Sequence, residues 1–185
     1  MEFNESSSKD AVSPASDQAD NRHHTDDRPR VGCGVITVSD TRTRADDRSG
    51  AEIERLLLEA GHRVVDRRIV PDASEQLRQA VLTASADPRI DAVLITGGTG
   101  IAPRDQTPEV LEPLLEVQLP GFGELFRAVS FAAIGPAAML SRAVAGRRGR
   151  TVVFAMPGST NAVRTAVEQL ILPVLTHAVA QAQQN

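Results

Sequence analysis

The sequence predicts an α/β fold, a three-layer α/β/α sandwich built on a mostly parallel sheet with an antiparallel edge strand. Apolar runs of strand length alternate with segments of helical periodicity along most of the chain. The connections between them are short, and this alternation is typical of parallel sheets covered by helices on both faces. A late pair of apolar runs reads as a hairpin, which adds one antiparallel strand at an edge.

Length and composition fit one globular domain. The chain has 185 residues, of which 41% are hydrophobic and 24% charged, enough for a substantial core. Residues 1–29 are rich in Ser, Asp, Asn and Gln. Such a segment cannot bury enough apolar surface to offset the entropy of ordering. We therefore predict a disordered tail at 1–29 and a domain at 30–185.

The first strand–helix unit begins with the apolar run at residues 31–38, which is readable as a buried strand. Ser49 precedes Glu52 by three residues, the pattern of a capping box, so a helix is expected to begin there. Gly61 supplies its C-terminal stop, and residues 62–70 form the second strand. The expected inner face of the helix consists of Ile53, Leu56, Leu57 and Ala60.

The second unit repeats this order. Ser74 is expected to cap a helix that ends at Asp87-Pro88. A short buried strand follows at residues 90–95, and Thr107-Pro108-Glu109 opens a short helix with Pro well placed at the first position. The inner stripe of the longer helix consists of Leu77, Ala80, Val81 and Ala84.

The last third of the domain holds two further helices and the hairpin. Pro120 opens a helix that Pro136 closes, and its inner face is read as Phe122, Leu125, Phe126 and Val129. Residues 141–145 and 151–156 form the hairpin around residues 146–149. A C-terminal helix follows, which Pro173 is expected to kink. Its inward residues are read as Val163, Ala166, Val167, Leu170, Ile171 and Val174.

The charge distribution argues against a nucleic-acid partner. Net charge is −4; residues 1–30 carry seven acidic and four basic side chains, and residues 31–185 carry seventeen and sixteen. The domain is near neutral and has no Trp or Tyr on which bases could stack. The only lysine of the whole chain is Lys9, which lies in the tail. An anion site in the domain must therefore use Arg, backbone N–H groups, helix N-termini or a metal.

Several features favour a cytoplasmic protein with no membrane association. No stretch of about 18 apolar residues suggests a transmembrane helix, and the polar N-terminus lacks the apolar region of a secretory signal. Cys33, the one cysteine, lies in an apolar run and is expected to be a buried, inert thiol.

Polar and glycine-rich segments follow the predicted parallel strands. In open parallel sheets, ligands bind outside the carboxyl ends of the strands, so these loops are expected to share one rim. They are Ser39-Asp40, Asp72, the loop from Gly97 to Gly100 with Arg104, Asp105 and Thr107 behind it, and Gly158-Ser159.

Each part of this rim has a chemical use. Glycines let the backbone approach a ligand and turn N–H groups toward an anion, and the helix start at Gly158-Ser159 is a ready phosphate site. Aspartates repel phosphate unless a cation lies between them. Asp40, Asp72 and Asp105 are therefore better read as partners of Mg²⁺ or of hydroxyl groups.

Simpler interpretations remain open for each loop. Glycine after a strand is often only a turn, Ser39-Asp40 fits an Asx turn, and Asp72 fits a surface turn. Arg104 and Asp105 could form a local ion pair of little energetic value. The loop from Gly97 to Gly100 lacks the Lys of a Walker A motif and the spacing of a dinucleotide fold.

The order of these motifs resembles the molybdopterin-binding MogA/MoaB family over about residues 31–175. The segments that carry the resemblance are Thr96-Gly97-Gly98-Thr99-Gly100, Arg104-Asp105-Gln106-Thr107-Pro108-Glu109, Pro120-Gly121-Phe122-Gly123-Glu124 with Arg127, Ser141-Arg142-Ala143 and Pro157-Gly158-Ser159. The stretches at residues 141–146 and 154–160 are closer to the MoaB branch.

The resemblance implies trimers, or hexamers in the MoaB branch, and a place in molybdenum cofactor biosynthesis. MogA-type members transfer AMP from ATP to molybdopterin with Mg²⁺ and release pyrophosphate. Two aspartates matter in those members, and the matching positions are Asp72 and Asp105, which are expected to be catalytic and to bind Mg²⁺. Some MoaB-branch members depart from the Arg-Asp-x-Thr-Pro motif. This chain retains it at Arg104 and Asp105, which favours adenylyl transfer.

The resemblance and the rim together define the expected binding residues. Arg142 and Gly158-Ser159 are expected to hold the pterin or its phosphate. The full set expected to bind substrate or nucleotide is Ser39, Asp40, Thr96, Gly97, Gly98, Thr99, Gly100, Arg104, Thr107, Pro108, Glu109, Glu124, Arg127, Ser141, Arg142, Pro157, Gly158 and Ser159.

Three other functions stay open at this point: a non-catalytic molybdopterin carrier, an interaction scaffold that meets other proteins of the cofactor pathway, and a different nucleotide-processing enzyme on the same fold.

Overall fold

A six-stranded sheet forms the centre of the computed structural model, which describes residues 30–184. Its order is β2-β1-β3-β6-β5-β4. The strands are β1 (Gly32–Val38), β2 (Arg63–Val70), β3 (Ala92–Thr96), β4 (Val117–Gln118), β5 (Val144–Arg148) and β6 (Thr151–Met156). Strands β2, β1, β3 and β6 pair in parallel, whereas β5 runs antiparallel to both β6 and β4. The predicted tail at 1–29 lies outside the described residues.

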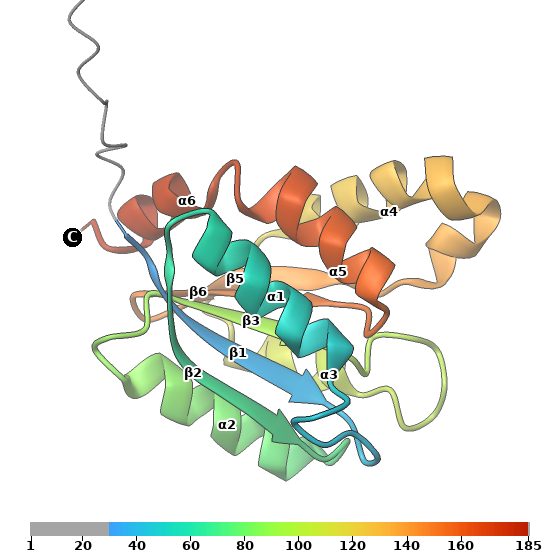
Figure 1. Cartoon of the computed structure of the whole chain (residues 1–185), viewed down its shortest axis with the longest axis horizontal. Helices are drawn as coiled ribbons and strands as arrows, with labels where there is room; N and C mark the ends of the chain where they lie inside the picture. The colour runs from blue at the N-terminus through green and yellow to red at the C-terminus, as the bar shows by residue number, and fades with distance from the viewer. Residues whose placement is uncertain (1–29, 185) are drawn as a thin grey trace, which may run out of the picture.

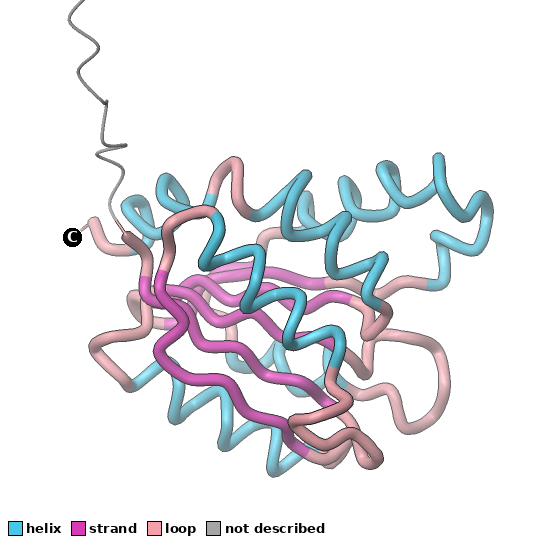
Figure 2. The backbone as a smooth tube through the Cα atoms, viewed as in Figure 1, coloured by secondary structure: helices cyan, strands magenta, loops and turns pink. Residues whose placement is uncertain are grey.

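Helices cover both faces of the sheet, as the predicted three-layer class requires. One face carries α1 (Arg48–Glu59), α4 (Pro120–Ile134), α5 (Thr160–Ala166) and α6 (Leu175–Ala182). The other carries α2 (Ser74–Ala86) and α3 (Thr107–Leu111). Figure 1 shows α2 below the sheet and the larger helical layer above it, and Figure 2 shows the strands between them.

Two apolar clusters hold these layers together. Along β1, Val35 packs with the α1 side and Ile36 with the α2 side, and Leu94 and Ile95 divide in the same way on β3. All four side chains are fully buried. Central strands buried on both faces read as continuous apolar runs, which is why the sequence predicted them.

The predicted edge of the sheet is correct in direction but incomplete. The antiparallel strand β5 lies one place inside the edge, because the two-residue strand β4 pairs with it through Val117 and Gln118. A two-residue strand leaves no periodic signal in the sequence. The hairpin turn is also displaced: Gly146 lies inside β5, and the turn falls between Arg148 and Thr151.

Both predicted N-caps are wrong. The N-cap of α1 is Asp47, whose Oδ1 accepts from the Gly50 amide at 2.9 Å, and the Ser49 hydroxyl donates to the same oxygen at 3.2 Å. Ser74 lies inside the first turn of α2, where its hydroxyl donates to the Gln106 side chain. Ser49 is thus engaged by the neighbouring Asp47, and Ser74 by a residue 32 positions along the chain.

Some predicted inward positions face solvent. Ala60 and Leu125 are exposed. On α4 the inner face includes Gly123, which lets the helix approach the Ala143 carbonyl: a Cβ there would lie 2.4 Å from that oxygen.

The C-terminal helix departs from its predicted face for a different reason. A π-turn at Val167–Ile171 precedes Pro173. The extra residue shifts the helical phase, so Leu175 is buried and Val174 is 47% exposed.

The segment Pro120–Leu140 is long and apolar enough, by length and composition alone, to count as one candidate membrane span. No such span was expected from the sequence. The segment joins α4 to the 3₁₀ turn Gly135–Leu140, and Phe122 and Phe126 pack into the core. Cys33 is fully buried in the same core, and burial raises the pKa of its thiol to about 12.

A buried ion pair fixes the loop after β1. The Arg67 guanidinium donates to Asp47 Oδ2 at 2.9 Å and to Glu54 Oε2 at 2.8 Å, and the Thr37 hydroxyl donates to Asp47 Oδ2 at 2.9 Å. Burial alone would raise the pKa of Asp47. The hydrogen bonds from the Gly50 amide, Arg67 and Thr37 outweigh that effect and hold the pKa below its ordinary value.

We predict that Asp47→Asn destabilises the fold by about 3 kcal/mol at pH 7, because it leaves the buried Arg67 with Glu54 as its one remaining charged partner. Since folding lowers the Asp47 pKa, its contribution is complete above the unfolded pKa of about 3.9 and disappears as pH falls through the folded pKa. Urea unfolding at pH 7 and below pH 4 measures this. A wild-type-minus-variant difference that stayed constant with pH would contradict the assignment.

Candidate functional site

The carboxyl ends of β1, β3 and β6 bring two glycine-containing loops together. The Gly97 amide donates to the Met156 carbonyl at 3.0 Å, and the Thr96 hydroxyl donates to the Pro157 carbonyl at 3.1 Å. A Cβ on Gly158 would lie 3.4 Å from the Gly97 Cα. The loops after β3 and β6 are therefore in direct contact, which places these predicted site residues at one edge of the sheet.

The backbone of the first loop requires glycine. Gly97 and Gly98 have φ values of +109° and +64°. A Cβ on Gly98 would lie 2.4 Å from Thr107 Oγ1 and 3.4 Å from Asp72 Oδ1. The Thr107 hydroxyl donates to the Gly97 carbonyl at 2.9 Å, and its amide donates to the Gly98 carbonyl at 3.0 Å. The loop is thus fastened to the start of α3 and borders the Asp72 carboxylate.

Three carboxylates gather beside this loop. The Asp72 amide donates to Asp40 Oδ1 at 2.9 Å. Burial raises the pKa of the Asp72 carboxyl, the charges of Asp105 and Asp40 raise it further, and Arg104 opposes them. Crowded carboxylates with a raised pKa are common at functional sites. The arrangement favours a cation that relieves their repulsion.

The carboxylates do not form a closed metal cage. Within residues 30–184, no group of three or more His, Cys, Asp or Glu side chains is placed to hold a metal ion. Mg²⁺ usually binds through one or two carboxylates and completes its shell with phosphate oxygens and water. The donor set at Asp72 and Asp105 fits a cation that arrives with a phosphorylated ligand.

Asp105 is held by its own loop. Its Oδ2 accepts from the Ala102 amide at 3.0 Å, and its amide donates to the Ala102 carbonyl at 2.8 Å. A Cβ on Gly100 would lie 2.6 Å from the same Oδ2. No ion pair joins Arg104 to Asp105 in the described part of the chain, so the local ion-pair alternative is not what the loop forms.

Arg142 faces the back of that loop. Its guanidinium donates to the Gly100 carbonyl at 2.8 Å, to the Asp105 carbonyl and to the Glu109 carboxylate. Its amide donates to the Thr99 carbonyl at 3.0 Å. Arg142 and Glu109, which the sequence predicted to bind a ligand, are therefore hydrogen-bonded within the protein.

A cavity of about 380 Å³ opens next to the rim, between α4 and α5. Its apolar wall includes Phe126, Ile134 and Leu140, and its polar end includes Thr99, Ser141 and Ser159. Ser159 also caps α5 by accepting from the Ala162 amide at 3.2 Å.

Two hydroxyls at the polar end of this cavity have no partner. The side-chain oxygens of Thr99 and Ser141 are buried and make no hydrogen bond. A buried, unsatisfied hydroxyl costs about 1–3 kcal/mol, which a ligand that bonds to it would recover. Both residues were predicted from the sequence to bind substrate or nucleotide. The cavity could not be predicted, because α4 and α5 meet only in the tertiary structure.

Several expected site residues have other roles or lie apart. Ser39 Oγ accepts from the amides of Thr41 and Arg42 at 3.3 and 3.2 Å, which is the turn suggested as its simpler interpretation. Arg127 donates to the Ser141 carbonyl at 3.3 Å and lines a separate hollow of about 170 Å³. Glu124 is exposed on α4.

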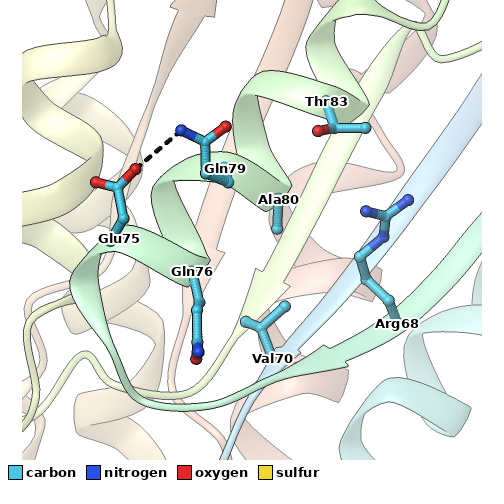
Figure 3. Close-up of a pocket in the computed structure, with 7 residues that line it drawn as sticks. All are labelled: Arg68, Val70, Glu75, Gln76, Gln79, Ala80 and Thr83. Atoms are coloured by element: carbon cyan, nitrogen blue, oxygen red, sulfur yellow. Dashed lines mark hydrogen bonds between the residues drawn. The ribbon is translucent and has the colours of Figure 1, made fainter.

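Another hollow, of about 300 Å³, lies between β2 and α2 (Figure 3). Glu75 and Gln79 are hydrogen-bonded to each other at 2.9 Å along one side of it. On the β2 side lies Arg68, which pairs with Asp66 at 2.5 Å. None of the residues expected from the sequence to bind a ligand lines this hollow, so it is not assigned to the site.

Comparisons with known proteins show which family the chain resembles. Residues 34–177 match the family model described as "Probable molybdopterin binding domain". Molybdenum cofactor biosynthesis protein B from Bacillus cereus is 51% identical over 148 residues, or 80% of this chain and 88% of that protein. The protein of the same name from Escherichia coli K12 is 48% identical over 141 residues, covering 76% and 83%.

Solved structures are similar over nearly their whole length. A crystal structure of molybdenum cofactor biosynthesis protein B has a TM-score of 0.84 at 48% identity, covering 85% of this chain and 99% of that one. The tungsten cofactor synthesizing protein MoaB from Pyrococcus furiosus has a TM-score of 0.76 at 39% identity, covering 84% and 98%. This chain therefore belongs to the MoaB family of molybdenum cofactor biosynthesis proteins.

Proposed function

We propose that this chain binds molybdopterin at the rim and adenylates it with MgATP, releasing pyrophosphate. The observation that carries the proposal is the junction of two unlike surfaces: crowded carboxylates at Asp72 and Asp105, and a cavity that ends in the unpartnered hydroxyls of Thr99 and Ser141. The first suits a cation with phosphates. The second suits a planar heterocycle with hydrogen-bonding edges.

The proposed reaction needs no protein nucleophile. A terminal phosphate oxygen of molybdopterin attacks the α-phosphorus of ATP, an O–P bond forms, and the bond from that phosphorus to the β-phosphate oxygen breaks. Catalysis is then positioning and neutralisation of charge. When bound, Mg²⁺ supplies positive charge to the phosphate oxygens, and Asp72 and Asp105 would hold it.

The remaining groups position the two substrates. The backbone amide of Gly98 and the helix start at Ser159 would receive phosphate oxygens. The pterin ring would occupy the cavity, where the hydroxyls of Thr99 and Ser141 meet its polar edge. Arg104 is near enough to lower the Asp72 pKa, and it would add positive charge beside the phosphates.

A molybdopterin-binding protein without turnover is the second candidate. The cavity with the unpartnered hydroxyls of Thr99 and Ser141 supports it, because binding of the pterin alone needs no metal ion. Purified protein with molybdopterin and MgATP, assayed for pyrophosphate, separates the two. Stoichiometric molybdopterin binding with no pyrophosphate would support the carrier and refute adenylyl transfer.

We expect Asp105→Asn to remove at least about 100-fold of the turnover, because it takes away a charge that balances the cation. The amide oxygen can still accept from Ala102, so the unfolding midpoint should change little. Asp87→Asn, at the opposite end of the sheet, where Asp87 accepts from Arg89, is the matched control. Pyrophosphate formation by Asp105→Asn at the wild-type rate would rule out this role.

Removal of the unpartnered hydroxyls should affect the stability of the protein and its affinity for molybdopterin differently. Thr99→Val and Ser141→Ala should leave stability unchanged or slightly raised, because no bond is lost in the free protein. Molybdopterin binding should weaken about 5–10-fold per hydroxyl. Thr151→Val is the control, since that buried hydroxyl donates to the Ile90 carbonyl at 3.4 Å away from the rim. If all three variants bind molybdopterin with equal affinity, the cavity does not hold the pterin ring.

We also infer that the exposed apolar side chains of α4 and the turn after it are covered in a homotrimer or homohexamer. Phe131 is 59% exposed, Ile134 57% and Met139 74%. A cluster of such side chains often marks an interface. Phe131→Glu with Met139→Glu should shift the molar mass from light scattering toward the monomer. Retention of the wild-type mass would place the interface elsewhere.

A further inference from the structure

We propose that Arg142 is a positioning residue, a latch that holds the loop of residues 100–105 in the shape that presents the Asp105 carboxylate. The sequence alone suggested a direct contact between Arg142 and the ligand. The effect on turnover rests on the proposed function, but the latch itself is a property of the free protein and can be tested without any ligand.

The latch consists of one guanidinium that joins three points. Nε donates to the Gly100 carbonyl at 2.8 Å, Nη2 donates to the Asp105 carbonyl, and Nη1 pairs with Glu109 on α3. The two carbonyls bracket the loop, and Glu109 anchors the guanidinium to a helix. The planar fork of arginine can serve three acceptors in fixed directions, which the single ammonium of lysine does less well.

The backbone of Arg142 reinforces this connection. Its amide donates to the Thr99 carbonyl at 3.0 Å, so the segment that leads into β5 is fastened to the residue just before the loop. Side chain and main chain of a single residue thus fix both Thr99, with its unpartnered hydroxyl, and the loop that follows.

The two sides of Asp105 have separate partners. Its carbonyl accepts from Arg142, while its carboxylate Oδ2 accepts from the Ala102 amide at 3.0 Å and packs over Gly100. Because the Asp105 amide also donates to the Ala102 carbonyl, residues 102–105 form a closed turn. Loss of the hydrogen bond from Arg142 to the Asp105 carbonyl frees this turn to change shape, and the Asp105 carboxylate then moves away from Asp72.

The same contacts argue against direct phosphate binding. An arginine that receives phosphate needs free donors in the direction of the ligand. Here one carboxylate and two carbonyls already take donors from three different nitrogens. Moving the guanidinium to an anion would leave those carbonyls and Glu109 without that partner.

Amide hydrogen exchange in the ligand-free protein tests the latch. We expect Arg142→Met to speed exchange across residues 102–107 by about tenfold, with smaller increases in Arg142→Lys and Glu109→Gln. Arg147→Met is the matched control: Arg147 also bonds a carboxylate and a carbonyl, Glu116 at 3.0 Å and Gly149 at 2.7 Å, and it is 35% exposed against 33% for Arg142. Unchanged exchange in Arg142→Met would overturn the latch.

Titration with inorganic pyrophosphate separates the latch from a direct anion contact. If Arg142 bound the anion, Glu109→Gln would release the guanidinium and tighten pyrophosphate binding. A latch predicts equal or weaker binding. Tighter binding in Glu109→Gln would therefore overturn the proposal.

The Mg²⁺ requirement gives the functional readout. Arg142→Met should raise the Mg²⁺ concentration for half-maximal turnover about tenfold, and Arg142→Lys should recover part of it; Arg147→Met should not change it. An unchanged Mg²⁺ requirement in Arg142→Met, with full turnover, would overturn the positioning role. Absence of turnover in wild-type protein would refute the proposed function, and the exchange experiment would still decide the latch.

Discussion

The parallel pairing of β1, β3 and β6 is the constraint on which the rest of the structure depends. It brings the ends of these strands to one edge of the sheet, so that the loops that follow must meet there. They meet with almost no space to spare: a Cβ on Gly97 would lie 2.4 Å from the Val38 carbonyl. Glycine is therefore required here by the packing of the strand ends, before any role in binding a ligand.

Two aspartates near this edge have pKa values shifted in opposite directions by their surroundings. Asp47 is buried, but the Gly50 amide, Arg67 and Thr37 supply its carboxylate with hydrogen bonds, and its pKa is lowered. Asp72 meets burial and like charges from Asp105 and Asp40, and its pKa is raised. The first carboxylate is satisfied within the fold and holds a loop in place. The second is suited to a partner from outside the chain, which is the physical basis of the proposed cation and phosphate chemistry.

The site owes its second half to α4. Gly123 allows this helix to approach the Ala143 carbonyl closely, and the cavity lies between α4 and α5. The floor of that cavity is apolar, while its end beside the rim carries the buried hydroxyls of Thr99 and Ser141. A ligand with a ring and a phosphorylated end would fit both parts, which is the basis of the proposed molybdopterin site.

The sequence by itself determined the α/β class, the parallel core and the membership of the rim, because strand and helix periodicity and motif order are local properties of the chain. It could not identify Asp47 as the α1 cap, the burial of Leu175 in place of Val174, or the strand β4. Only the tertiary structure decided these, together with the cavity and the direction of Arg142. In each case the deciding partner is distant in the chain or the helical phase has changed: Arg67 lies 20 residues from Asp47, and Gly100 lies 42 residues from Arg142.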